Sequence, residues 1–173
     1  MTTKEISDAA NLSAGALALL REDSTPETFV DALEKQELYE DAVNFWAHKL
    51  AADAGVKWAL ACIRELESPE QKARKSASLE AADRWVLAPG DATRWAAKDA
   101  ADKSTETAPA DILAIGIFLS GGSIASPQSP AVEPPPYSAQ KLISGSVRVT
   151  VLTHEPQNAA ARYKRALTLG RGQ

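Results

Sequence analysis

Alanine is the residue that most constrains how this chain can fold. It accounts for 33 of the 173 residues, whereas aromatic residues make up only 6%. Alanine loses no side-chain entropy in a helix and lets neighbouring helices approach closely, so this bias favours helices. Apolar residues also recur at intervals of three and four, as in Val56, Leu60 and Ile63, which is the spacing of one helix face. We therefore expect an all-α fold.

Capping signals divide the chain into about seven to eight short helices, which we expect to pack as helical hairpins. A hydroxyl residue followed by proline marks a helix start at Thr25-Pro26 and again at Ser68-Pro69. We expect the helix that begins at Ser68-Pro69 to run to about Leu87. The most hydrophobic segment, Ile112 to Leu119, has apolar residues on nearly every side and should be a central helix.

The length of the chain fits one domain, residues 1–173. Residues 1–10 are expected to be a disordered tail. Residues 124–137 are expected to be an extended, proline-rich surface segment between the last helices, because five of the twelve residues from Ser126 to Tyr137 are proline. Residues 139–153 fit both a strand and a helix; we favour a helix because a lone strand would lack a partner for its backbone.

The charge and the few metal-binding side chains exclude several classes of protein. A formal net charge of −4 argues against a nucleic-acid partner. One cysteine, Cys62, and two histidines, His48 and His154, are too few for a disulfide framework or a Cys/His zinc site. The first ten residues do not resemble a signal peptide, and no apolar stretch reaches about 18 residues. We expect a cytoplasmic protein with no metal, cofactor or membrane partner.

The same three residues are the obvious candidates for catalysis, and none has the partners that catalysis needs. His48 lacks an assignable carboxylate and nucleophile, so we expect it to pack or cap a helix. We expect His154 to lie at the surface. Cys62 follows an apolar, alanine-rich stretch, whereas a reactive thiolate needs an electropositive and accessible site. We predict no catalytic residues and no enzymatic activity.

Two motifs are candidates for binding. Ser120, Gly121, Gly122 and Ser123 form a glycine turn that follows a helix, whereas a phosphate-binding loop precedes one, so we favour a structural turn. The run Pro134, Pro135, Pro136 and Tyr137 spells a ligand of the kind that aromatic-lined grooves bind. We favour the alternative that this run covers core surface within the molecule, since proline loses little entropy on folding.

The four tryptophans are expected to fill the core or the spaces between helices. An exposed tryptophan would be an interface anchor, because aromatic residues contribute strongly to binding. Two of them belong to the pairs Arg84-Trp85 and Arg94-Trp95, ten residues apart. The flanking residues do not match, so we interpret the pairs as coincidence and not as a repeat.

The order of these segments is similar to that of a bacterial family of uncharacterised, all-helical proteins of about this length. The shared stretches are Leu12 to Leu20 followed by Thr25-Pro26 and Phe29; Glu37 to Ala42 leading into Ala47 to Leu50; Trp58 to Cys62; Leu119 to Ser123; Pro134 to Pro136; and Arg162 to Arg165 before Leu169-Gly170. The chain departs from the family at Leu119, where tryptophan is preferred, and at Trp46, where an aliphatic residue is preferred. The resemblance implies no activity, and at most an association with type VI secretion gene clusters.

We therefore expect a non-enzymatic helical module that binds another protein, as an accessory or adaptor of a bacterial secretion system. The expectation depends on the lack of a reactive constellation and on short helix pairs, which commonly form concave binding surfaces. One alternative is an immunity or regulatory protein with a single dedicated partner. Another is a small-molecule binding domain with a pocket near Trp58 and the Gly121-Gly122 turn.

Overall fold

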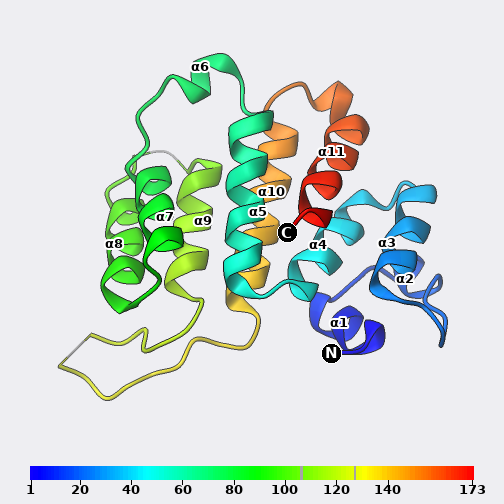
Figure 1. Ribbon diagram of the computed structural model, residues 1–173, viewed down its shortest axis with the longest axis horizontal. Coiled ribbons are helices and arrows are strands. Elements are labelled where there is room, and N and C mark those ends of the chain that lie inside the picture. The colour runs from blue at the N-terminus through cyan, green and yellow to red at the C-terminus, as the bar shows by residue number, and fades with distance from the viewer. Residues whose placement is uncertain (106, 127) are drawn as a thin grey trace.

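The computed structural model describes residues 1–105, 107–126 and 128–173, and all regular structure among them is helical (Figure 1). These residues form eleven α-helices and one 3₁₀ turn, more than the seven to eight helices expected. The helices are α1 (Thr3–Ala10), α2 (Ala14–Leu17), α3 (Pro26–Lys35), α4 (Tyr39–Lys49), α5 (Ala52–Leu66), α6 (Pro69–Lys72), α7 (Ala77–Leu87), α8 (Asp91–Asp102), α9 (Pro109–Phe118), α10 (Ser138–Thr153) and α11 (Ala159–Arg171), with the turn η1 at Pro156–Asn158. The all-α expectation is confirmed, and residues 139–153 are helical.

The two longest helices, α5 and α10, pack against each other at the centre of one compact body. Figure 1 shows α7, α8 and α9 on one side of this pair, and α1 to α4 with α11 on the other. Helix α9 contacts α5, α7, α8 and α10, so the segment expected to be central is central. No helix among the described residues is both long and apolar enough to cross a membrane.

The core is continuous across the central pair of helices. Its largest fully buried side chains come from six helices: Phe29, Leu33, Phe45, Trp58, Ile63, Leu113, Ile117, Ile143 and Leu167. Helices α9 and α10 approach closely at Gly116, where an added Cβ atom would lie 3.2 Å from Cβ of Leu142. Small residues at such crossings explain how a chain with few aromatics fills its interior.

Residues 1–10 are not a disordered tail, because residues 3–10 form helix α1. The hydroxyl of Thr2 accepts from the Glu5 backbone N–H at 3.2 Å, and the Glu5 carboxylate accepts from the Thr2 N–H at 2.7 Å. This reciprocal capping box satisfies two backbone donors at the start of the helix. Ile6 is 2% exposed and belongs to the core, and α1 packs against α4. The tertiary contact with α4 orders the segment.

The single helix expected from residue 69 to Leu87 is two helices, α6 and α7, separated by residues 73–76. The Ser76 hydroxyl accepts from the Leu79 backbone N–H at 3.1 Å and starts α7. A serine side chain in this position competes with continued helical hydrogen bonding. Lys72 ends α6, and Arg74 and Lys75 lie within the break; the mutual repulsion of these three cations disfavours one uninterrupted helix.

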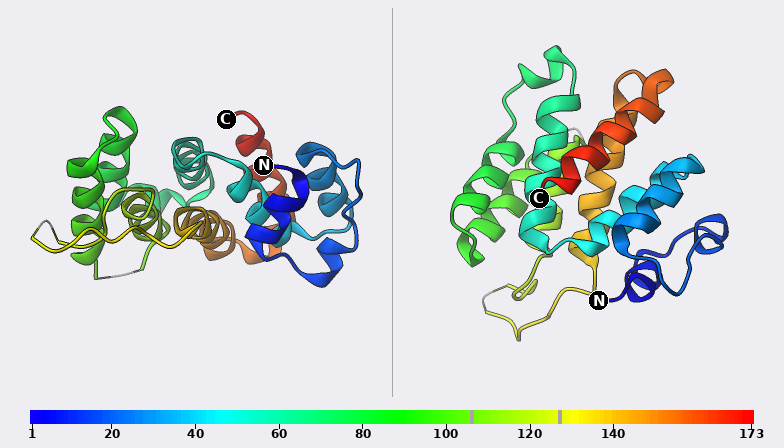
Figure 2. Two further views of the ribbon diagram at one scale, coloured as in Figure 1. Left: turned by 90° about the horizontal axis from the view of Figure 1, so that it is seen from below. Right: turned by 45° about the vertical axis from the view of Figure 1, so that its right-hand side comes forward.

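The described part of residues 124–137 contains no helix and projects beyond the ends of α9 and α10 (Figure 2). Pro127, part of the expected proline-rich segment, lies outside the described residues. Pro135 and Pro136 are exposed, so the expectation that the run covers core surface is wrong for these two residues. Tyr137 is 38% exposed, but its ring lies against the buried His48, with ring centroids 5.7 Å apart. Helices α9 and α10, which the segment connects, pack directly on each other.

Candidate protein-binding surface

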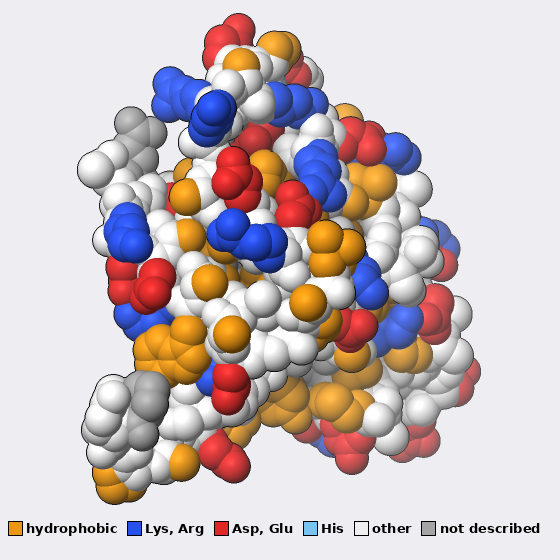
Figure 3. Space-filling model, turned by 60° about the vertical axis from the view of Figure 1, so that its left-hand side comes forward, with side chains coloured by type: hydrophobic (Ala, Val, Ile, Leu, Met, Phe, Trp, Pro, Cys, Tyr) orange, Lys and Arg blue, Asp and Glu red, His pale blue; other side chains and the backbone are white. Residues whose placement is uncertain are grey.

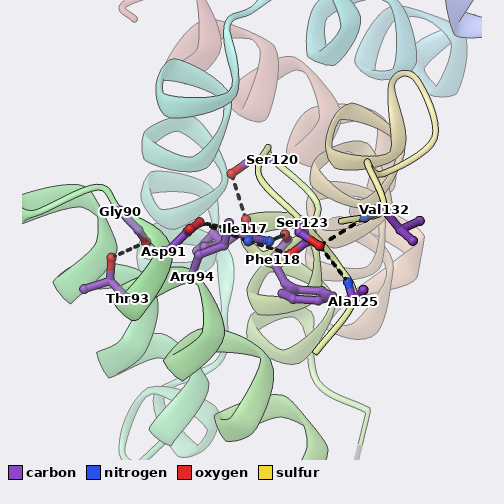
Figure 4. A network of polar contacts seen from close by, with 10 residues as sticks. All are labelled: Gly90, Asp91, Thr93, Arg94, Ile117, Phe118, Ser120, Ser123, Ala125 and Val132. Carbon is purple, nitrogen blue, oxygen red and sulfur yellow. Dashed lines mark hydrogen bonds and ion pairs between the residues drawn. The ribbon is translucent and has the colours of Figure 1, made fainter. Parts of the chain in front are cut away.

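A buried arginine, Arg94, holds the turn from which the proline-rich segment departs (Figure 4). It lies on α8 and is only 3% exposed. Its guanidinium donates to the Phe118 carbonyl and, at 2.8 Å, to the Ser123 carbonyl. Carbonyls at a helix C-terminus lack partners within the helix and carry partial negative charge. Arg94 therefore supplies both a donor and a positive charge at the end of α9.

The glycine turn fits closely over this arginine. The Asp91 carboxylate accepts from Nε and Nη2 of Arg94, at 3.2 and 3.0 Å. Gly122 has φ +63°, and an added Cβ would lie 2.7 Å from the Asp91 Oδ1 atom and 2.8 Å from Arg94 Nη2. The Ser120 hydroxyl donates to the Ile117 carbonyl at 2.7 Å. These contacts support a structural turn, because Arg94, the cation beside it, is already paired with the Asp91 carboxylate and with two backbone carbonyls.

Hydrogen bonds fix both ends of the proline-rich segment. The Ser123 hydroxyl accepts from the backbone N–H groups of Ala125 and Val132, each at 3.1 Å, and Ile124 N–H donates to the Val132 carbonyl at 2.8 Å. At the other end, the Ser138 hydroxyl donates to the Pro135 carbonyl at 2.7 Å. The exposed residues between these anchors are thus held against the helical body at two points.

Aromatic rings flank the turn. Trp95 and Phe118 pack edge to face, with ring centroids 4.8 Å apart, and Trp95 is half-buried. A cavity of about 230 Å³ lies between Trp95, Asp91, Ser123 and the following loop. This volume is below the range of roughly 300 to 1,000 Å³ typical of small-molecule sites. The surface beside the turn is therefore better suited to a protein contact than to enclosing a ligand.

The two arginine–tryptophan pairs have opposite burial. On α7 Trp85 is buried and Arg84 is exposed, whereas on α8 Arg94 is buried and Trp95 is only half-buried. The same dipeptide thus presents opposite members to the core in the two helices. This reversal supports the interpretation that the pairs are a coincidence.

Trp58 is separate from the turn. It is fully buried on α5, and its indole N–H donates to the Ala166 carbonyl of α11 at 2.7 Å. Neither the cavity beside Trp95 nor a larger cavity, of about 710 Å³, beside the start of α7 is lined by Trp58, Gly121 or Gly122. The geometry gives no support to the alternative function, a small-molecule binding domain with a pocket near Trp58 and the glycine turn.

Two of the three candidates for catalysis, Cys62 and His48, are buried, and burial disfavours the charged form of each. Burial raises the pKa of the Cys62 thiol to about 12, and burial lowers the pKa of His48. The Nδ1 atom of His48 lies 2.7 Å from the Asn44 carbonyl, while its Nε2 atom is buried without a hydrogen-bond partner. His154 is partly exposed beside Glu155. Among the described residues, no group of three or more His, Cys, Asp or Glu side chains is placed to hold a metal ion.

Sequence reasoning missed Arg94, although a signal for it exists. Arg94 precedes Ala97 by three residues, and Ala97 is fully buried, so the arginine lies on the buried stripe of α8. A cation on such a stripe needs buried acceptors. Its acceptors, the carbonyls of Phe118 and Ser123, are 24 and 29 residues away in the chain, which periodicity alone does not reveal.

Comparison with known proteins yields one family. No curated protein and no solved structure matches the chain. One family model matches residues 29–172, a span that includes the Arg94 turn and the proline-rich segment and leaves out α1 and α2. That family is described only as one of unknown function, so it supplies no activity to set beside the geometry. The match extends over well more than half of the chain, which therefore belongs to this family, DUF6931.

Proposed function

We propose that the protein is a non-enzymatic module that binds another protein through residues 132–137, hereafter the proline segment. One observation carries the proposal: Pro135, Pro136 and Tyr137 are exposed on a loop that hydrogen bonds fix at both ends. Proline has little conformational freedom to lose, and the fixed ends restrict the loop further. A preorganised segment binds with a smaller entropic cost than a flexible one.

The side chains of the proline segment suit an apolar, aromatic-lined groove. Val132 is 50% exposed and Tyr137 is 38% exposed, which is unusual for large apolar residues in this protein. Proline rings stack on aromatic side chains, and the tyrosine adds a polar hydroxyl at one end. The partner we propose is a protein whose binding groove is lined with aromatic residues.

The absence of a catalytic role is part of the same proposal. It is supported by the buried Cys62 and His48, whose protonation equilibria both disfavour the charged form. From the resemblance to a bacterial family we further propose that the protein acts as an accessory or adaptor of a secretion system.

The test compares the natural chain with a triple variant, Pro135→Ala/Pro136→Ala/Tyr137→Ala. Pro89→Ala is the control, because Pro89 is also exposed but lies in the turn between α7 and α8. Proteins recovered from the native host with the purified chain would be identified, produced separately and titrated by calorimetry. We expect the triple variant to bind at least tenfold more weakly, and the control to bind within twofold of the natural chain.

Two results would contradict the proposal. One is a purified partner that binds the triple variant as tightly as the natural chain. The other is the failure to recover any protein with a chain that is itself monomeric.

A further inference from the structure

A second candidate site lies on a different part of the molecule from the proline segment. It is a cavity of about 710 Å³ between the end of α5, the start of α7, the loop after α8 and the start of α9. No residue of the proline segment lines it. Its volume falls within the roughly 300 to 1,000 Å³ of typical small-molecule sites. It is therefore large enough for a small molecule, whereas the cavity beside Trp95 is not.

The charge of this cavity is opposite to that of the whole chain. Among the described residues that line it are five cations, Arg64, Lys72, Arg74, Lys75 and Lys103, and two carboxylates, Glu67 and Asp111. The chain as a whole has a formal net charge of −4. Figure 3 shows several Lys and Arg side chains at the top of this face, where α6 lies in Figure 1, with Asp and Glu side chains among them. A concentration of positive charge in an acidic protein attracts anions to this face.

Two of these cations are available to a ligand. Among the residues that the structure describes, Lys75 and Lys103 have no carboxylate within ion-pair distance. Lys72 donates to the Glu65 carbonyl at 3.0 Å, and its charge also lowers the pKa of the Glu65 and Glu67 carboxyls, which offset part of it. Arg64, in contrast, is paired with Asp83.

Of the two described carboxylates in the cavity, Asp111 is held by its own hydrogen bonds, whereas Glu67 interacts with Lys72. Asp111 is 8% exposed and accepts hydrogen bonds from the Ser78 hydroxyl, from the Ser104 hydroxyl at 2.9 Å and from the Ala108 N–H at 3.0 Å. Asp111 therefore caps the start of α9, where a carboxylate is stabilised by the helix dipole. Burial raises the pKa of Glu67, and Lys72 opposes that shift.

The cavity also offers an apolar surface and hydroxyl groups. Ile63, Leu79 and Val149 come from three different helices and supply the apolar part. Ser76, Thr105 and Thr107 supply hydroxyls, which can donate to anionic oxygens. The site thus combines an apolar wall with cations and hydroxyl donors, the combination expected for a ligand with an apolar body and a strongly acidic group.

We propose that this cavity binds a small organic phosphate, with the phosphate between Lys75 and Lys103 and the apolar body against Ile63, Leu79 and Val149. A phosphate monoester carries close to two negative charges and three acceptor oxygens, which match two lysines and hydroxyls better than one carboxylate does. Lysine binds phosphate as a point charge and needs no fixed geometry. A bound apolar group would add the free energy of removing its surface from water.

The experiment uses phenyl phosphate as the probe, with inorganic phosphate, phenol and hexaglutamate as comparisons, all at one ionic strength. Binding is followed by calorimetry and by amide chemical shifts of the full chain. We expect phenyl phosphate to bind at least tenfold more tightly than the other three, with shifts concentrated at Ala77, Leu79 and Thr107. Equal binding of inorganic phosphate, tighter binding of hexaglutamate, or shifts spread over the molecule would overturn the proposal.

Charge-matched variants locate the site. Lys75→Glu/Lys103→Glu should weaken phenyl phosphate binding at least tenfold, whereas Lys35→Glu/Lys141→Glu, which alters exposed lysines outside the cavity by the same charge, should change it less than twofold. Circular dichroism would verify that both are folded, and Lys75→Gln/Lys103→Gln serves if the first variant is not. Equal weakening by the two pairs would show a general charge effect and refute the site.

Discussion

Replacing Arg94 with methionine tests the central claim about the glycine turn. Methionine keeps the unbranched, apolar part of the buried side chain but removes the guanidinium and with it every donor. The Phe118 carbonyl, on a residue that is 6% exposed, loses a charged donor worth about 2 kcal/mol. The Ser123 carbonyl lies on a half-buried residue that water reaches, so we assign it about 1 kcal/mol. The Asp91 side chain is 76% exposed, and its ion pair adds little.

The expected loss is therefore about 3 kcal/mol in the free energy of unfolding, which for a chain of this length lowers Tm by about 6 to 12 °C. Urea unfolding and thermal melts measure it. Arg84→Met is the matched control, because Arg84 also precedes a tryptophan but is exposed on α7. We expect the control to change stability by less than about 0.5 kcal/mol. Equal effects of the two substitutions would refute the proposed role of Arg94.

Three further outcomes follow from the structure. Gly122→Ala should destabilise the fold by about 1 to 3 kcal/mol in urea unfolding, because of its positive φ and the crowding by Arg94; Gly121→Ala, with open space at its Cβ, should not. Burial lowers the pKa of His48, so the unfolded chain binds its proton more readily and stability should fall as pH drops below about 6.5. Urea unfolding from pH 8 to 5.5 checks this, and an equally steep fall in His48→Gln would contradict it. Cys62, with its pKa raised to about 12, should react with Ellman's reagent at pH 8 only as the chain unfolds, and rapid native reaction would disprove its burial.

The sequence predicts a helix best where a capping residue and an apolar stripe occur together. Thr25-Pro26 starts α3, and the dense apolar residues of α9 place it at the centre. Helix α1 could not be recognised because its short apolar stripe is stabilised by α4, which the local pattern does not contain. The break before α7 was missed because the Ser76 cap competes with an apolar spacing that runs past it.

The candidate sites divide in the same way. The glycine turn could be predicted from its place after a hydrophobic helix, since only local backbone geometry is involved. The cavity could not, because residues such as Ile63, Lys75, Lys103 and Val149 come together only when four separate segments pack. Lys72, Arg74 and Lys75 are visible as a basic cluster in the sequence, but the pattern does not tell a solvated loop from the rim of a cavity.

Helix α1 affects which residues of this protein should be expressed. The shared family region begins at Phe29, after α1, yet Ile6 sits in the same core as Phe29 itself. A protein that begins at residue 29 would lack α1, and the apolar surface of α4 that α1 covers would be exposed to water. Such exposed apolar surface promotes aggregation. Expression trials are better begun at the first methionine, with the leading helix kept as part of the folded unit.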